Sequence, residues 1–173
     1  MNTIVAVDEK WGIGCDGKLL YDIPEDMRFF RETTAGKVVV MGLTTLKSLP
    51  NSKPLKNRVN IVLSYDDDPV LTGDIIVCKS IGELLKAVKE YDSNDVFVIG
   101  GQAIYRQLLE YCKVAYITKI KGAKKADTFF PDVDKMDNWE LESMSEEKEH
   151  ARLKFTFCKY INKVLLNKVG QLV

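Results

Sequence analysis

Short apolar runs that alternate with helix-forming segments are the feature that most restricts the fold of this 173-residue chain. The runs are nearly continuous in Val, Ile and other apolar residues, as in KVVVMG and DVFVIGG. Continuous hydrophobicity indicates strands buried on both faces, and such strands form parallel sheets covered by helices on both sides. Six runs fit this description, at 3–8, 37–42, 58–64, 75–78, 95–101 and 113–120.

Helices are predicted between these strands, and the pattern changes after residue 120. A helix is expected over 24–34 with Asp22 as its cap, and Ser80 with Glu83 predicts a capping box for another. NWELESMS and ARLKFTFCKYI alternate with period two, which indicates an antiparallel hairpin. The glycine-rich stretch WGIGCDGKLL is predicted to be a mobile loop. We therefore predict an α/β fold with a mainly parallel central sheet that ends in an antiparallel hairpin.

Charge and hydropathy exclude several classes of function. Lys plus Arg and Asp plus Glu number 25 each, so the net charge is zero. A general nucleic-acid binder, which depends on phosphate neutralisation, is not expected. The longest apolar runs are too short for a membrane span, and the segment MNTIVAVDEKWG lacks the charged start and long apolar centre of a signal peptide. A cytoplasmic monomer is the expectation.

Cysteine and histidine usage restricts the possible chemistry further. Cys15, Cys78, Cys112 and Cys158 show no Cys-x-x-Cys spacing, so they are predicted to be free thiols. His150 is the single histidine, and a solvated turn residue is its predicted state. No metal site is expected, and a His-assisted nucleophile is disfavoured.

The stretch YDIPEDMRFF places an acid beside apolar groups. On a helical wheel Asp26 lies at the edge of a face formed by Ile23, Met27 and Phe30, whereas Glu25 points away. The simple interpretation of both acids is favourable interaction with the helix dipole. The alternative for Asp26 is a carboxylate that faces a ligand.

Two strand ends could bind phosphate, because ligands of parallel sheets lie beyond the carboxyl ends of the strands. VIGGQ and MGLTT each lead from a strand into a helix and offer backbone N–H groups or a hydroxyl to an anion. A plain Gly-Gly turn and a plain helix cap remain alternatives. Arg58 could clamp a carboxylate or lie free on the surface, and Thr118 in an apolar strand needs a polar partner.

Taken in order, GIGCDGKL, IPEDM, VVVMGLTT, NIVLS, VFVIGGQAIY, YITKI and DTFFP resemble the dihydrofolate reductase family over roughly residues 1–160. The resemblance implies a central eight-stranded sheet with about four flanking helices, as one domain over 1–161. Residues 162–173 are then a C-terminal extension of unknown role. It also implies NADPH-dependent reduction of 7,8-dihydrofolate to tetrahydrofolate, in support of one-carbon metabolism, with antifolates as inhibitors.

The resemblance assigns roles to individual residues. Asp26 would bind the pterin amino group and N3, assisted by Tyr21 and Thr118, and Arg58 would hold the glutamate α-carboxylate. A cis bond is implied at Gly100–Gly101, and 12–20 would close over the nicotinamide. The substrate pocket would be lined by Val5, Ala6, Met27, Phe30, Leu49, Leu55, Ile99 and Tyr105. The cofactor would contact Ala6, Ile13, Gly14, Gly42, Leu43, Thr44, Thr45, Leu63, Ser64, Lys79, Ile99, Gly100, Gly101, Gln102, Ala103, Ile104 and Tyr105.

Three positions depart from the family pattern. Tyr21 stands where the family usually has Trp, and Leu43 and Tyr65 stand where it usually has basic residues near the 2′-phosphate of NADPH. NADPH remains the expected cofactor, with reduced discrimination against NADH. The alternatives are a pyrimidinone reductase of riboflavin synthesis with the same fold, a non-catalytic nucleotide-binding module and an interaction protein. Asp26 together with Arg58 favours the folate enzyme.

Overall fold

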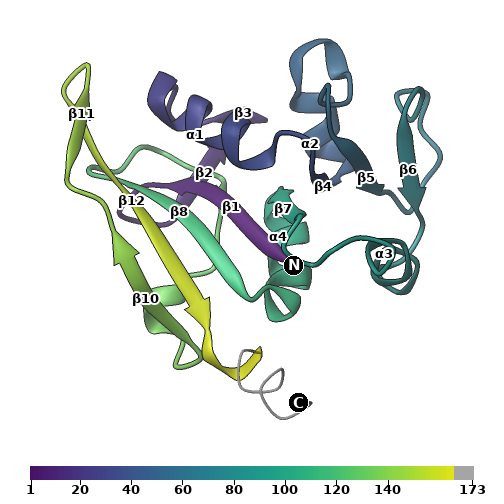
Figure 1. Ribbon diagram of the computed structural model, residues 1–173. Helices are drawn as coiled ribbons and strands as arrows, with labels where there is room; N and C mark the ends of the chain where they lie inside the picture. Colours follow the sequence, from purple (N-terminus) through teal and green to yellow (C-terminus); the bar gives the residue numbers. More distant parts are fainter. Residues whose placement is uncertain (166–173) are drawn as a thin grey trace.

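The strands of the computed structural model, which describes residues 1–165, form one large and one small sheet (Figure 1). In the large sheet the strand order is β10-β12-β8-β1-β7-β4-β5-β6, and β11 pairs with β12. The elements are β1 (Asn2–Val7), β2 (Gly12–Cys15), β3 (Lys18–Leu19), α1 (Pro24–Thr34), β4 (Val38–Gly42), α2 (Leu43–Ser48), η1 (Pro50–Ser52), β5 (Val59–Leu63), β6 (Ile75–Cys78), α3 (Ile81–Val88), β7 (Val96–Gly100), α4 (Gln102–Leu108), η2 (Leu109–Tyr111), β8 (Val114–Ile120), β9 (Thr128–Phe129), η3 (Val133–Lys135), β10 (Trp139–Met144), β11 (Lys148–His150) and β12 (Leu153–Asn162).

The pairing of the strands confirms the predicted fold class. β1, β4, β5, β6, β7 and β8 are parallel neighbours, whereas β12 runs antiparallel to both β8 and β10. The register places Thr118 of β8 between Ala6 of β1 and Phe157 of β12. Strand ends of the parallel part therefore meet along one edge, where ligand sites of such sheets form.

Alternate side chains of the strands point to two differently covered faces. One face packs against α3 and α4, and its core includes Val40, Leu84, Val98 and Leu108. The opposite face carries two separate apolar clusters. One of them joins Leu46 of α2 to β4 and β5, and the other joins Ile23 at the start of α1 to Ile120 and Phe155. The helices thus lie in pairs, with α1 and α2 on the face that bears both smaller clusters (Figure 1).

The stretch predicted as a mobile loop is instead a short hairpin. β2 pairs with β3 and also with β9, in an antiparallel arrangement. A Cβ at Gly12 would lie 2.8 Å from the Ala126 Cβ, and one at Gly14 would lie 2.7 Å from the Thr128 Oγ1. Close packing between strands explains these two glycines, so they do not mark flexibility.

Helix caps and termini differ in part from expectation. Ser80 caps α3 and accepts a hydrogen bond from the Glu83 N–H at 3.1 Å, as predicted. The expected Asp22 cap is wrong, because Ile23 is the N-cap of α1 and no side chain bonds to the exposed N–H groups there. All four cysteines are free thiols, as predicted. The expected extension 162–173 lies mostly outside the described residues, which end at 165.

Within residues 1–165 no helix has the length and hydrophobicity needed to cross a membrane.

Candidate active site

Asp26 lies in the middle of the buried face of α1, and the sequence-based position at its edge is wrong. The reason is Phe29, whose ring centroid lies 4.7 Å from that of Phe157 and 6.3 Å from that of Tyr116. Phe29 extends the covered face on one side of Asp26, and Phe30 lies on the other side. The helical wheel did not assign Phe29 to the buried face, because the side chains that cover it belong to β8 and β12, which are distant in the sequence.

Burial and a hydroxyl act in opposite directions on the Asp26 carboxyl. Desolvation raises its pKa above the ordinary value, and a hydrogen bond with the Thr118 side chain partly opposes this. Thr118 is only 1% exposed and faces α1 from β8. Thr118 is thus near enough to Asp26 to influence its pKa, and a carboxyl with a raised pKa is suited to proton chemistry.

Half-buried apolar side chains surround this acid on the same face of the sheet. Ala6 belongs to the cluster at the start of α1, and Ile99 belongs to the cluster under α2. Four further predicted lining residues are half-buried as well, namely Met27, Phe30, Leu49 and Leu55. Apolar groups that remain partly exposed around a single carboxyl are typical of a ligand site.

Two predicted lining residues belong to the main core instead. Val5 and Tyr105 are 9% and 4% exposed and pack on the side of α3 and α4. The Tyr105 hydroxyl donates a hydrogen bond to the Ile4 carbonyl at 2.9 Å. Burial raises the Tyr105 pKa, and the negative charge of Asp26 raises it further. The phenol therefore stays protonated and anchors β1, and its ring lies 3.3 Å from the position of a Cβ at Gly100, beside the glycine turn.

Tyr21 is held by a residue that the sequence did not single out. The ammonium of Lys124 lies 4.2 Å from the centroid of the Tyr21 ring. Desolvation raises the Tyr21 pKa, and the negative charges of Asp8 and Glu9 raise it further. The Tyr21 ring packs beside Ala6 and Ile23. Its hydroxyl lies near enough to the carboxylates that follow β1 for their charge to raise its pKa.

Arg58 is fixed by the end of α1. Its Nε and Nη2 both lie 3.2 Å from the Thr34 Oγ1, Nη2 donates to the Arg31 carbonyl at 2.9 Å, and Nη1 donates to the Lys56 carbonyl at 2.7 Å. The guanidinium has five N–H groups, so these four contacts leave one donor of Nη1 available. Arg58 is thus a half-exposed cation whose guanidinium is oriented by four hydrogen bonds.

The turn after β7 has no room for side chains. Gly100–Gly101 is a cis peptide, as the resemblance implied. A Cβ on Gly101 would lie 3.2 Å from the Thr45 Oγ1, and one on Gly42 would lie 2.9 Å from the Ile104 Cγ1. Gly42 and Gly101 therefore lie directly against the side chains of Ile104 in α4 and Thr45 in α2, and the missing Cβ atoms leave backbone that a phosphate can approach closely.

Gln102 and Ile13 connect this turn to the hairpin. The Gln102 Oε1 accepts a hydrogen bond from the Phe129 N–H at 2.6 Å, and β9 in turn pairs with β2. Ile13 lies in β2 and packs against the main core. The hairpin and the glycine turn are therefore connected through β9. These two segments carry six of the predicted cofactor residues, which are Ile13, Gly14, Gly100, Gly101, Gln102 and Ala103.

The remaining predicted cofactor residues stand at the ends of β4, β5 and β6. Leu43 follows β4, Leu63 and Ser64 end β5, and Lys79 follows β6. The register places these strand ends side by side. The Lys79 Nζ is already bound to the Asp67 Oδ1 at 2.7 Å.

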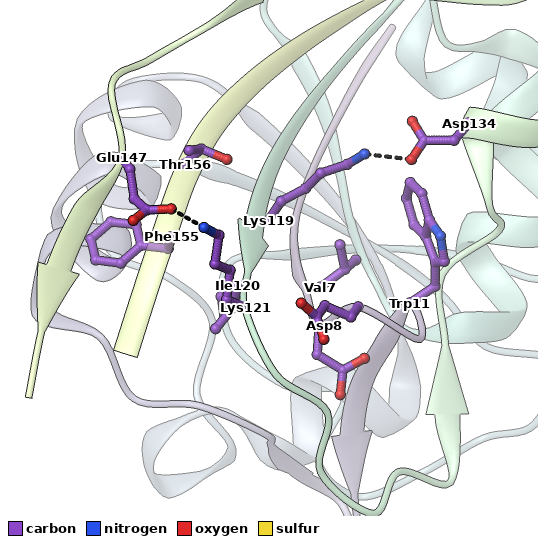
Figure 2. Close-up of a pocket in the computed structure, with 11 residues that line it drawn as sticks. Val7, Asp8, Trp11, Lys119, Ile120, Lys121, Asp134, Glu147, Phe155 and Thr156 are labelled. Carbon is purple, nitrogen blue, oxygen red and sulfur yellow. Dashed lines mark hydrogen bonds and ion pairs between the residues drawn. The ribbon is translucent and has the colours of Figure 1, made fainter. Parts of the chain in front are cut away.

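A surface cavity of about 330 Å³ lies elsewhere, at the ends of β1 and β8 (Figure 2). Its two lysines point in opposite directions, Lys119 to Asp134 at 2.5 Å and Lys121 to Glu147. No polar groups converge on its centre, whereas Asp26 and Thr118 converge outside it. We therefore assign the chemistry to the Asp26 site.

His150 is not the solvated turn residue that was predicted. It ends β11, and its Nδ1 lies 3.3 Å from the Glu25 Oε2. Glu25 therefore contacts the C-terminal hairpin in addition to standing in the first turn of α1. Sequence counting could not show this contact, because 125 residues separate the two side chains.

Comparisons with known proteins agree on one family. The family model described as dihydrofolate reductase matches residues 1–162. The dihydrofolate reductase of Schistosoma mansoni is 38% identical over 148 residues, covering 78% of this chain and 79% of that protein. That of Staphylococcus aureus is 32% identical over 165 residues, covering 94% of this chain and 98% of that protein.

Longer relatives and a solved structure also match. The bifunctional dihydrofolate reductase-thymidylate synthase of Glycine max is 37% identical over 147 residues, which cover 76% of this chain but only 28% of that protein. The chain thus corresponds to a minor part of such bifunctional relatives. The structure of Enterococcus faecalis dihydrofolate reductase complexed with NADP(H) and RAB-propyl superposes with a TM-score of 0.82 at 31% identity, covering 92% of this chain and 94% of that one.

Proposed function

Because the chain belongs to the dihydrofolate reductase family, we propose that it reduces 7,8-dihydrofolate to 5,6,7,8-tetrahydrofolate with NADPH. The observation that carries this proposal is the half-buried Asp26 carboxyl, whose pKa is raised by desolvation against the opposing effect of the Thr118 side chain, amid half-buried apolar side chains. A carboxyl in such surroundings can pair with the amino group and N3 of a pterin, while the ring packs on the apolar groups.

The substrate extends from Asp26 towards Arg58 in this proposal. Met27, Phe30, Leu49 and Leu55 would contact the pterin and benzoyl rings. The free Nη1 donor of Arg58 would bind the glutamate α-carboxylate, and its four other contacts hold the guanidinium in place for this role. Preorganisation of this kind limits the entropy lost on binding.

The cofactor fits the turn at Gly100–Gly101. The crowding of both glycines and of Gly42 leaves only backbone at this edge, and Thr45 adds a hydroxyl. Gly101, Gln102 and Ala103 at the start of α4 would hold the pyrophosphate, and Ala6, Ile13 and Gly14 would hold the nicotinamide. When bound there, NADPH supplies the hydride that the pterin C6 receives.

In this proposal Asp26 orients the pterin ring and favours its protonation. Its charge favours the pterin orientation that exposes C6, and its surroundings exclude most water. The pterin N5 must also gain a proton, which water can deliver while Asp26 stabilises the positive charge that develops on the ring. Thr118 keeps the carboxyl in one orientation from β8.

One assay tests the proposal. Oxidation of NADPH at 340 nm with dihydrofolate should occur and should stop with an antifolate diaminopyrimidine. Asp26→Asn should lower turnover at pH 7 by at least about 100-fold, with unchanged binding of NADPH. Glu25→Gln is the matched control on the same helical turn and should retain turnover. Absence of dihydrofolate-dependent oxidation, or unaffected turnover in Asp26→Asn, would refute the proposal.

We further propose a cytoplasmic monomer whose catalytic domain spans 1–161. The four free thiols, three of them buried, suit a reducing compartment. Light scattering after gel filtration should give a mass close to 19.6 kDa. A larger mass would contradict the monomer.

A further inference from the structure

The direction of the cofactor across the sheet follows from the strand order. Asp26 and Thr118 lie over β1 and β8, and the glycine turn follows β7 beside the end of β4. A dinucleotide with its nicotinamide near β1 and its pyrophosphate at β7 must extend its adenosine over the ends of β5 and β6 (Figure 1). We call these strand ends the ribose corner, consisting of Leu43, Ser64–Asp68 and Lys79.

Three donors of the ribose corner, on Ser64 and Lys79, are already engaged within the protein. The Ser64 hydroxyl donates to the Asp66 carbonyl at 2.7 Å, and the Lys79 Nζ donates to that carbonyl at 2.9 Å and to the Asp67 Oδ1 at 2.7 Å. The Lys79 N–H donates to the Glu83 Oε2 at 2.7 Å. A phosphate at this corner would have to displace these contacts.

The charge of the corner is negative overall. Asp66, Asp67 and Asp68 follow one another, and Lys47 contacts Asp68 at 2.5 Å. The lysine contacts hold the pKa values of Asp67 and Asp68 below the ordinary range, so both carboxylates stay ionised at neutral pH. Each of the two ammonium groups is paired with one of these acids, the Glu83 carboxylate accepts from the Lys79 backbone N–H, and Leu43 supplies no charge.

A ribose 2′-hydroxyl and a 2′-phosphate make opposite demands on such a corner. The phosphate carries about two negative charges and needs free cations. The hydroxyl is a donor, and a carboxylate is its usual partner in dinucleotide sites. Resting on the function proposed above, we propose that the ribose corner accepts a 2′-hydroxyl as readily as a 2′-phosphate, so that the enzyme uses NADH as well as NADPH.

Steady-state kinetics with both cofactors tests this directly. The ratio of kcat/KM for NADPH to that for NADH should lie below about tenfold, which corresponds to about 1.4 kcal/mol. A ratio above that value overturns the proposal. If neither cofactor supports dihydrofolate reduction, the function proposed above fails, which is a different outcome from turnover with NADPH alone.

Ligand binding gives a second readout that does not require turnover. Calorimetry should find adenosine 2′,5′-bisphosphate bound within about tenfold of AMP. Replacing the three acids together by Asn (Asp66→Asn, Asp67→Asn, Asp68→Asn) should tighten the bisphosphate at least about fivefold without tightening AMP, because the acids repel the 2′-phosphate but accept a hydrogen bond from the 2′-hydroxyl.

The control variant is Glu90→Gln, which removes one exposed acid of the segment after α3. It should leave the binding of both adenosine ligands unchanged. An equal effect of the triple variant on both ligands would overturn the proposal, and so would tight bisphosphate binding by the unmodified protein.

Discussion

The Lys124 ammonium lies 4.2 Å from the centroid of the Tyr21 ring and donates a hydrogen bond to the neighbouring Leu20 carbonyl at 2.7 Å. The Lys124 N–H also donates to the Asp8 Oδ2 at 3.1 Å. Asp8 is 3% exposed, and its other oxygen binds the N–H groups of Lys10 and Gly12. One loop residue thus joins the end of β1 to the chain segment between the hairpin and α1.

Replacement of Lys124 should therefore affect the substrate side of the site. Lys124→Met removes the cation over Tyr21 and the donor to Leu20, and a cation–π contact at an exposed site is worth about 0.5–1 kcal/mol. We expect kcat/KM for dihydrofolate to fall about three- to tenfold, with an unchanged KM for the cofactor. Steady-state kinetics with each substrate varied in turn measures both quantities.

Two further variants separate positioning from a general loss of charge. Lys124→Arg keeps both contacts and should restore most of the activity. Lys125→Met removes the adjacent exposed lysine and should behave as the unmodified enzyme. Equal losses in Lys124→Met and Lys125→Met would show that the contact with Tyr21 has no functional role.

Arg58 should contribute to both substrate affinity and stability. Arg58→Leu removes four hydrogen bonds to Arg31, Thr34 and Lys56, at a cost of about 1–3 kcal/mol in the free energy of unfolding. It should also raise KM for dihydrofolate at least about tenfold. Urea denaturation and initial rates measure the two effects.

The substrate itself provides the control for Arg58. Dihydropteroate lacks the glutamate, so its KM should be nearly the same for Arg58→Leu and the unmodified enzyme. Lys56→Met removes a nearby exposed charge and should leave both substrates unaffected. A comparable loss of affinity for dihydropteroate would place the glutamate elsewhere.

The sequence predicted the parallel sheet because the apolar runs are local. The pattern around Asp26 left a helix-dipole acid and a ligand-facing carboxylate as alternatives, and the family resemblance favoured the second. Contacts between distant segments were not predictable in this way. Phe29 is covered by β8 and β12, Glu25 meets His150, and Lys124 reaches Tyr21. Each contact depends on which loops the strand order brings together, and neither periodicity nor spacing carries that information.

Local composition also misled where packing determined the outcome. The glycines at 12 and 14 suggested a flexible loop, yet each is required by the close approach of another chain segment. Lys79 was predicted from its position to lie near the cofactor, and the fold adds an exposed ion pair with Asp67 that the sequence did not indicate. In both cases the neighbouring group is contributed by a distant part of the chain, and the sequence alone does not identify it.

Gly101 should be sensitive to a single methyl group. In Gly101→Ala the new Cβ would lie 3.2 Å from the Thr45 Oγ1 and would occupy the edge where we place the pyrophosphate. We expect the cofactor Kd to rise at least about tenfold, with a smaller change in KM for dihydrofolate. Fluorescence quenching by NADPH measures this. Gly82→Ala, where the nearest atom lies 3.8 Å away, is the control, and cofactor affinity unchanged in both variants would remove the pyrophosphate from this turn.

Asp26 should lower the stability of the free protein, and this effect should depend on pH. Burial raises its folded-state pKa above the ordinary value of 3.8, so the folded state binds the proton more tightly than the unfolded state does. Both states are protonated below that value, and no stability is lost there. As the pH rises towards and beyond the folded-state pKa, ionisation of the buried carboxyl lowers the free energy of unfolding.

Asp26→Asn keeps the shape of the side chain and removes this cost. The variant should therefore match the unmodified protein in Tm below about pH 4, gain on it as the pH rises through the folded-state pKa of Asp26, and keep a constant advantage above that pKa, while its turnover is lost. Glu25→Gln, in the same turn of α1, should not reproduce the rising gain. Thermal unfolding from below about pH 4 to about pH 8 measures the difference, and a gain that is the same at every pH or falls with pH would contradict a raised pKa at Asp26. A gain that rises with pH would show that the site retains a destabilising acid because its chemistry requires one.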